Sequence, residues 1–264
     1  MGTLNHPLVE DRIISGEGTP KEKWLQAFEE HPLDSLNLES LHFKRVVIVA
    51  PHPDDEILGC GGLMQQLMAQ NCKIIILAVS NGTQSHPDSN KYSPDELNIL
   101  RPQESLAALK CLGVSEAVER IELNLLDGQI HCQTTQLWQG LSRIVQAEDI
   151  LICSYAFDGH PDHEAVGKIV QAFAEDRQLV CLHVLIWAWH WAMPLDPRID
   201  WHRAKAYKLT EEQLAKKHEA ILQFKTQIEV DESTGKAAIL SSKTISRLLM
   251  PYEVYLSDSF SHVF

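Results

Sequence analysis

Two short segments of the sequence place histidine beside carboxylate residues. The first is His52-Pro53-Asp54-Asp55-Glu56, and the second is Asp158-Gly159-His160-Pro161-Asp162-His163. Imidazole nitrogens and carboxylate oxygens are ligands that zinc accepts, and a catalytic zinc takes three of them from the protein while one position stays open for water. Together the two segments supply three such ligands with acid–base groups to spare. They predict a metal site with proton-transferring residues next to it.

The first segment also has simpler explanations. Asp54 or Asp55 could cap a following helix, where an acidic side chain is favourable near the positive end of the helix dipole. Capping accounts for one aspartate but not for a histidine, three consecutive acids and the two prolines Pro51 and Pro53 together. The nearby glycines (Gly59, Gly61, Gly62) come too late and lack the spacing of a dinucleotide-binding turn, which must follow a strand directly.

Each segment follows a short apolar run that is typical of a buried parallel strand. Arg45–Ala50 precedes the first segment and residues 149–154 precede the second, and helices are expected afterwards over residues 57–70 and 163–174. Ligands of such sheets bind at the carboxyl ends of the strands, at a topological switch point. The two segments are therefore expected to meet at one edge of the sheet.

The alternation of strands and helices continues along the chain and predicts an α/β fold, a Rossmann-like, mostly parallel sheet with helices on both faces. Further strands are expected at 73–79, 120–124 and 179–188, and further helices at 21–30, 97–112, 136–148 and 210–224. Residues 1–43 are predicted to be an N-terminal extension, and residues 44–264 a single domain.

The composition excludes several classes of function. With a formal net charge of −13, the chain lacks the basic surface that a nucleic-acid binder needs to displace counterions. We find no apolar run of about 18 residues to span a bilayer, and the first twenty residues lack the apolar core of a signal peptide. The sequence predicts a cytoplasmic protein without integral membrane association, and it is compatible with a homo-oligomer. The six scattered cysteines are expected to be buried free thiols.

The paired motifs HPDDE and HPDH resemble those of the LmbE-like/PIG-L family of N-acetylglucosaminyl deacetylases. The resemblance runs from about residue 45 to residue 167, and the segment from Arg101 to Glu104 between the motifs is similar to the family's Arg-x-x-Glu helix. A weaker similarity follows where a helix ends in FKTQ, near residue 227. The loop SNGTQSHPDSN departs from the family's usual Thr-x-Gly-Glu-x-Gly type.

The resemblance implies a role for most residues of the two motifs. The implied cofactor is Zn²⁺, and the implied metal ligands are His52, Asp55 and His163. Asp54 would be the general base. His160 would be the general acid and would stabilise the oxyanion, with its pKa raised by the neighbouring Asp162. Other divalent transition metals also suit mixed nitrogen and oxygen ligands.

Substrate-binding residues are less narrowly defined by the sequence. The resemblance implies that Arg101 contacts the substrate, but an ion pair with Glu104 at i,i+3 explains this arginine equally well. Asn81 and His86 lie in the loop expected beside the pocket and are further candidates. The tryptophan-rich segment 187–201 could stack on a sugar or an acyl chain, or it could pack in the core or at a subunit interface.

The predicted function is a zinc-dependent hydrolase that removes an N-acetyl or other N-acyl group from an N-acetylglucosamine-type small molecule or glycoconjugate. One alternative is a metal-dependent hydrolase of another linear amide or ester. Another is a metal-binding homologue that has lost its chemistry. Asp54 and His160 argue against the last alternative, because a purely structural zinc needs neither of them.

Overall fold

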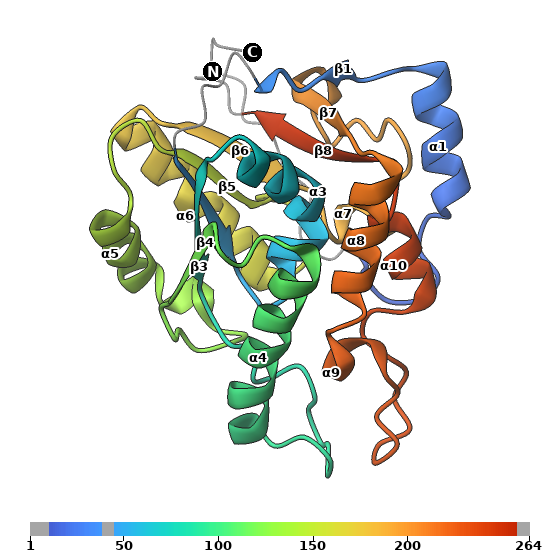
Figure 1. Cartoon of the computed structure of the whole chain (residues 1–264). Helices are drawn as coiled ribbons and strands as arrows, with labels where there is room; N and C mark the ends of the chain where they lie inside the picture. The colour runs from blue at the N-terminus through green and yellow to red at the C-terminus, as the bar shows by residue number, and fades with distance from the viewer. Residues whose placement is uncertain (1–10, 39–44, 258–264) are drawn as a thin grey trace.

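A computed structural model describes residues 11–38 and 45–257 of the chain. The described residues form one eight-stranded sheet with the order β1-β7-β8-β6-β5-β2-β3-β4 (Figure 1). The strands are β1 (Asp34–Ser35), β2 (Arg45–Ala50), β3 (Lys73–Ala78), β4 (Val118–Glu122), β5 (Ile150–Ser154), β6 (Val180–Val184), β7 (Ala204–Lys208) and β8 (Tyr252–Ser257). All neighbours pair in parallel except β8, which is antiparallel to both β6 and β7. The predicted α/β class with a mostly parallel sheet is confirmed.

Helices cover both faces of the sheet (Figure 1). The longer ones are α1 (Lys21–Glu30), α3 (Asp55–Ala69), α4 (Pro94–Leu112), α5 (Thr134–Ile144), α6 (Pro161–Arg177) and α8 (Glu211–Ile221). Shorter ones are α7 (Ala188–Trp191), α9 (Lys225–Ile228) and α10 (Ser242–Leu248), with 3₁₀ turns at Ile130–Cys132 and Trp201–Arg203. One core lies between the sheet and α1, α3, α4, α8 and α10, and the other lies between the sheet and α5 and α6.

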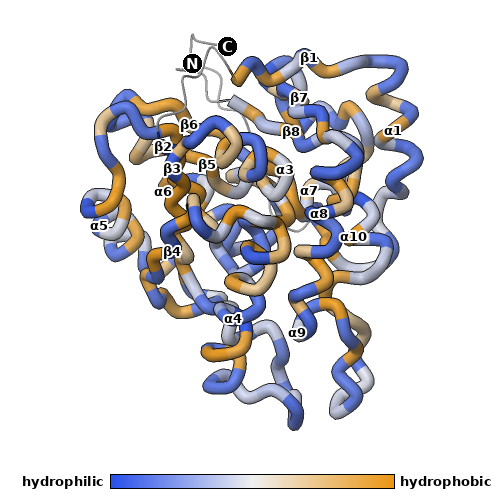
Figure 2. Tube along the Cα trace, viewed as in Figure 1, coloured by the Kyte–Doolittle hydropathy of each residue, from blue (hydrophilic) through white to orange (hydrophobic). Residues whose placement is uncertain are grey.

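The central strands are apolar at almost every position because they are buried on both sides. In β2, Val46 and Ile48 face the core under α3, whereas Val47 and Val49 face the core under α6. Figure 2 shows this hydrophobic band along the middle of the sheet. The continuous apolar runs in the sequence are thus the mark of doubly covered parallel strands.

The order of the strands creates a switch point beside β2. The chain leaves β2 for β3 and β4 on one side, and then returns to add β5 and β6 on the other side. Because β2 and β5 are parallel neighbours, the loops after them lie side by side at the same edge. These loops carry the two histidine–carboxylate motifs, as the sequence predicts.

Local signals in the sequence explain several helix ends. Thr210 and Gln213 form a capping box at the start of α8. Gly113 ends α4 in the left-handed region with φ of 80°. The predicted start of α4 is three residues late, because Ser93 and Glu96 form a second capping box and Pro94 occupies the first turn.

Other elements differ from the expectations. Strand β6 ends at Val184, so the predicted strand 179–188 is too long at its carboxyl end. Strands β7 and β8, which widen the sheet on its mixed side, are absent from the predicted set. The thiols are free, but Cys111 and Cys132 are exposed, whereas Cys60, Cys72, Cys153 and Cys181 are buried as expected.

The segment before β2 packs against the rest of the chain. Helix α1 has the predicted bounds, and its Trp24 is fully buried with its ring 4.8 Å from that of Trp189. Strand β1 joins the sheet beside β7. Residues 1–10 and 39–43 of the predicted extension, and its boundary with the domain, lie outside the described residues. Among the described helices, none is both long and apolar enough to cross a bilayer.

Candidate active site

The first motif forms the tight connection between β2 and α3. Asp54 directly precedes helix α3 and has φ of 151° and ψ of −33°, a backbone conformation that residues other than glycine rarely adopt. Its side chain makes no capping hydrogen bond, so capping does not explain this aspartate. The backbone N–H of Asp54 donates to Glu56 Oε2 at 3.1 Å, and Ser105 Oγ donates to the other oxygen of Glu56. Buried hydrogen bonds thus hold the strained turn in place.

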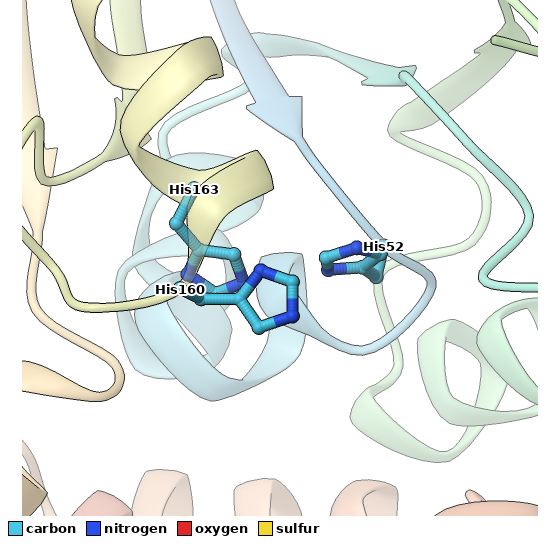
Figure 3. A group of neighbouring side chains, drawn as sticks. All are labelled: His52, His160 and His163. Carbon is cyan, nitrogen blue, oxygen red and sulfur yellow. The ribbon is translucent and has the colours of Figure 1, made fainter. Parts of the chain in front are cut away.

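The second motif forms the connection between β5 and α6. His160 is the N-cap residue of α6, and its Nδ1 accepts a hydrogen bond from the backbone N–H of Asp162 at 3.3 Å. His163 lies in the first turn of the helix and is fully buried. Figure 3 shows that the rings of His160 and His163, from this segment, face the ring of His52 from the loop after β2.

The structure brings the three expected metal ligands together. Asp55 Oδ2 lies 3.3 Å from His52 Nδ1 and 3.3 Å from His163 Nε2. It also accepts the backbone N–H of His52 at 3.0 Å, which fixes the carboxylate within its own loop. Two imidazole nitrogens therefore lie 3.3 Å from one carboxylate oxygen. Two nitrogens and one oxygen are a donor set that a three-ligand catalytic zinc site can use.

The opposite nitrogen of each histidine expected to bind the metal contacts a buried carboxylate. His163 Nδ1 lies 2.8 Å from Asp158 Oδ2, and His52 Nε2 lies 3.1 Å from Asp127 Oδ1 and 3.3 Å from Asp162 Oδ2. Each histidine can place its proton on the nitrogen that faces these carboxylates, which leaves the nitrogen facing Asp55 free to bind a metal. Such carboxylate–histidine pairs are the usual support of protein metal sites, so the residues present fit a metal ion.

Asp158 connects this site to the segment after β6. Its Oδ1 accepts the backbone N–H groups of Ile186 and Ala188, both at 3.0 Å. Its Oδ2 accepts the N–H of Trp187 at 3.0 Å in addition to its bond with His163. This fully buried carboxylate therefore holds the segment at the start of α7 and contacts His163, an expected metal ligand, at the same time.

His52, Asp55 and His163 form a cluster, called here the ligand cluster, whose surroundings favour a positive charge. Burial lowers the pKa of His163, but the carboxylates of Asp55 and Asp158 outweigh it and raise the pKa to about 9. The pKa of His52 also lies well above its usual range, because its hydrogen bonds to Asp127, Asp162 and Asp55 together outweigh burial. Burial raises the pKa of Asp55, but the two imidazoles reverse this and hold it well below its usual range.

Asp54 lies beside the cluster, where Arg101 supports it. Arg101 Nη2 donates to Asp54 Oδ2 and to the carbonyl oxygen of Pro53, both at 3.2 Å, and Nη1 donates to the carbonyl oxygen of Gly82 at 2.9 Å. Burial raises the pKa of Asp54 to about 7, although the Arg101 guanidinium acts in the opposite direction. A carboxylate with this pKa can both accept and return a proton near neutrality.

His160 differs from the expectation. Burial and the neighbouring imidazoles of His163 and His52 lower the pKa of His160 to about 2. The Asp162 carboxylate, expected to raise this pKa, contacts His52 instead and accepts the backbone N–H groups of Gly128 and Ile130. His160 is therefore a neutral imidazole whose Nδ1 is an acceptor, so its proton is on Nε2.

The expected substrate-binding residues have different surroundings. The alternative ion pair of Arg101 with Glu104 is wrong, because Glu104 accepts hydrogen bonds from the backbone and the hydroxyl of Thr226. Asn81 donates to the side chains of Asn98 and Asn124. His86 contacts Ser85 Oγ and the ring of Tyr92.

A cavity of about 440 Å³ opens over the cluster. It is lined by Ile14, His52, Asp54, Asp55, Leu58, Gln84, Ser85, Arg101, Asp127, Gly128, His160, His163, Ile186, Trp187, Gln227, Ile239 and Leu240. Neither Asn81 nor His86 belongs to this lining. Sequence reasoning missed Asp127, although it follows β4 at the same edge of the sheet. A larger cavity of about 710 Å³ lies beside Tyr155 and Trp201, and no residue of the two motifs lines it.

The tryptophan-rich segment belongs mainly to the core. Trp189 and Trp201 pack against the buried Trp24. Trp191 Nε1 donates to the carbonyl oxygen of Asp158 at 2.8 Å. Trp187 is the one tryptophan of the described residues that lines the cavity above the ligand cluster.

Comparison with known proteins agrees with this geometry. Residues 47–174 match the PIG-L family, described as GlcNAc-PI de-N-acetylase. The chain is 30% identical over 142 residues to the uncharacterized deacetylase YaiS of Escherichia coli (strain K12). The aligned residues make up 51% of this chain and 70% of that protein. The chain belongs to the PIG-L family. Both motifs lie within the matched region, together with β5 and most of β2.

Other relatives have narrower names. The chain is 26% identical over 129 residues to the diacetylchitobiose deacetylase of Thermococcus kodakarensis. The aligned residues make up 47% of this chain and 46% of that enzyme, so the chain spans about half of its length. The fold is similar to that of the N,N'-diacetylchitobiose deacetylase from Pyrococcus horikoshii. That structure has a TM-score of 0.62 and 18% identity, with 82% of this chain and 84% of that chain covered.

Proposed function

We propose that this chain is a zinc-dependent hydrolase that removes an N-acetyl or other N-acyl group from an N-acetylglucosamine-type amino sugar. The observation that supports it most is the position of Asp55 within 3.3 Å of both His52 and His163, with Asp54 beside them and bonded to Arg101. The names of the relatives, deacetylases of sugars, support the reaction class and the substrate class.

The metal would be held by His52 Nδ1, Asp55 Oδ2 and His163 Nε2. A zinc ion in such a site supplies a water whose pKa is about 7 and polarises the amide carbonyl. The protein's own contribution is to fix the ligands through Asp158, Asp127 and Asp162.

Asp54 is the general base in this proposal. Arg101 donates to its Oδ2, which leaves Oδ1 to take the proton of the attacking water. Because the pKa of Asp54 is about 7, the same carboxyl can pass this proton to the departing amine. Arg101 thus acts as a positioning residue for Asp54, and its place in the cavity lining also lets it contact the substrate.

His160 stabilises the oxyanion as a neutral donor. Its Nδ1 is bonded to the Asp162 N–H, so Nε2 carries the proton that can be donated. This role replaces the general acid that the sequence suggests, because the pKa of His160 lies far below neutrality. Removing one oxyanion donor typically lowers the rate by about 10²–10³-fold.

The test is a panel of N-acylated amines and esters scored by the release of amine or acid. Zinc-loaded protein is expected to release amine from N-acetylglucosamine conjugates, with Asp54→Asn as the blank. Activity confined to esters, or to amides other than those of sugars, would favour the alternative function, a metal-dependent hydrolase of another linear amide or ester. Zinc binding without any hydrolysis would identify a non-catalytic homologue. The cytoplasmic location and the homo-oligomer stay predictions from the sequence.

A further inference from the structure

The segment before α1 lies against the second motif, although the two are far apart in the sequence. The carbonyl oxygen of Arg12 is 3.1 Å from the point that a Cβ atom on Gly159 would occupy. Gly159 itself has φ of 96°, a left-handed conformation that favours glycine. Residues 11–19, called here the N-terminal strap, therefore pass close to the turn between Asp158 and His160.

Buried polar contacts hold the N-terminal strap in place. Arg247 Nη1, from α10, donates to the carbonyl oxygens of Glu17 at 3.0 Å and Thr19 at 3.3 Å. The N–H of Thr19 donates to the carbonyl oxygen of His190 in α7 at 2.9 Å. The carbonyl oxygen of Ser15 lies 3.2 Å from His190 Nε2. The strap thus has a defined path across α7 and α10 before it reaches the second motif.

The side chain of Arg12 contacts a carboxylate of α6. Arg12 Nη2 lies 3.0 Å from Glu164 Oε1, and the two side chains are only 5% and 4% exposed. The guanidinium also lies over the ring of Phe157, 5.5 Å from its centroid. The other oxygen of Glu164 accepts a hydrogen bond from Lys168, whose side chain is 53% exposed. Arg12 is therefore the buried cation that fixes Oε1, whereas Lys168 contacts Oε2 from the surface.

Glu164 in turn holds the peptide between Gly159 and His160. Its Oε1 accepts the backbone N–H of Gly159 at 3.3 Å, and its own backbone N–H donates to the carbonyl oxygen of His160 at 3.0 Å. The preceding residue, Asp158, is fixed separately by three backbone N–H groups of the segment after β6. The orientation of His160 therefore depends on Glu164 more than that of Asp158 does.

We propose that Arg12 is a positioning residue that acts through Glu164 on His160, so that the N-terminal strap completes the oxyanion site. This proposal rests on the proposed function, in which His160 Nε2 donates to the oxyanion, and it adds a residue to the same site. The guanidinium fixes the oxygen of Glu164 that also accepts the Gly159 N–H. Without Arg12 this peptide can turn, and the direction of His160 Nε2 changes with it. Arg12 lies outside the family match at residues 47–174, in the segment that precedes β2.

Steady-state kinetics of the zinc-loaded protein on a methyl glycoside of N-acetylglucosamine test the proposal. An oxyanion donor acts in the transition state, so Arg12→Met is expected to lower kcat by about 10–100-fold and to leave KM unchanged. Zinc affinity should also stay unchanged, because Asp158 keeps its partners. Arg12→Lys keeps a positive charge beside Glu164 and should restore most of the lost activity.

Arg177→Met is the matched control, because it removes an arginine from the far end of α6 whose ion pair with Asp176 is exposed. Its kcat should equal that of the original chain. Melting temperatures report whether each variant folds. If Arg12→Met does not fold, Arg12→Gln takes its place, since it keeps a polar side chain at this position and should lower kcat in the same way but less.

A double variant separates positioning from a general structural role. In a His160→Ala protein the oxyanion donor is already absent, so adding Arg12→Met should lower kcat no further. A structural role of Arg12 elsewhere would lower kcat by the same factor in both backgrounds. Single-turnover measurements give the rate of the slower variants.

Several results would overturn the proposal. An unchanged kcat in folded Arg12→Met or Arg12→Gln protein would refute it and leave the proposed function standing. An equal further loss in the His160→Ala background would show that Arg12 does not act through His160. A rise in KM alone would show that the strap acts on substrate binding, since Ile14 lines the cavity. If the original zinc-loaded chain hydrolyses no N-acylated amino sugar, the proposed function is refuted, and this proposal falls with it.

Discussion

Replacing Asp158 by asparagine tests whether a carboxylate behind the cluster sets the metal affinity. An asparagine whose oxygen takes the place of Oδ1 keeps the bonds to Ile186 and Ala188. The amide nitrogen then replaces Oδ2, and it cannot accept the protons of His163 Nδ1 and the Trp187 N–H. Two of the four hydrogen bonds are lost, and His163 is no longer held in the tautomer that leaves Nε2 free.

The magnitude follows from these two losses. Removing such a support of a metal ligand lowers metal affinity by about 10–100-fold. The hydrogen bonds of a charged group contribute about 1.5–3 kcal/mol each, so the metal-free protein is expected to lose roughly 3 kcal/mol or more of unfolding free energy. The effect on folding must therefore be separated from the effect on zinc.

The assay is zinc affinity by chelator competition, measured at a temperature where urea unfolding shows the variant to be folded. Asp176→Asn is the matched control, because Asp176 is an exposed aspartate of α6 far along the helix from His163. The control should keep the affinity of the original chain. A folded Asp158→Asn protein with unchanged zinc affinity would refute the role given to this carboxylate.

Three further predictions concern the base, the buried ion pair and the thiols. Asp54→Asn should keep one bound zinc by elemental analysis while kcat/KM falls by about 10²–10⁴-fold; loss of the zinc, or unchanged activity, would contradict the role of Asp54. Lys217→Met leaves the buried Glu253 without its ion-pair partner at 2.7 Å, so the free energy of unfolding in urea should fall by about 3–5 kcal/mol. Lys216→Met, the control at a position facing solvent, should lower it far less. Equal losses in the two variants would contradict the importance of the buried pair. In the native protein a thiol reagent should modify the exposed Cys111 and Cys132 quickly and the other four cysteines only after unfolding, and a fast reaction of all six would argue against the buried positions.

The sequence predicts those parts of the fold that depend on local patterns. The parallel strands are apolar throughout because both of their faces are covered, and that pattern is visible in β2 and β5. The capping box at Thr210 is equally local. In contrast, β8 pairs antiparallel with two strands that are distant in sequence, and no local signal specifies that register.

The candidate site shows the same division. The strand-end rule places His52, Asp55 and His163 at one edge without any knowledge of side-chain positions. Which group the Asp162 carboxylate contacts depends on the loop that brings Gly128 and Ile130 to it, so its partner is His52 and not His160. Asp127 was missed because a single aspartate in a loop has no distinguishing pattern. The low pKa of His160 arises from burial and from two imidazoles that only the fold brings near.

A crystal structure of the zinc-loaded protein, with the metal located by its anomalous scattering, tests the central claim most directly. One zinc ion is expected to be bonded to His52 Nδ1, Asp55 and His163 Nε2 at about 2.0–2.2 Å. Asp54 should lie outside the ligand set and remain bonded to Arg101. Zinc bound elsewhere, for example at the buried cluster of Cys153, Cys181 and His183, with the first cluster empty, would contradict the account.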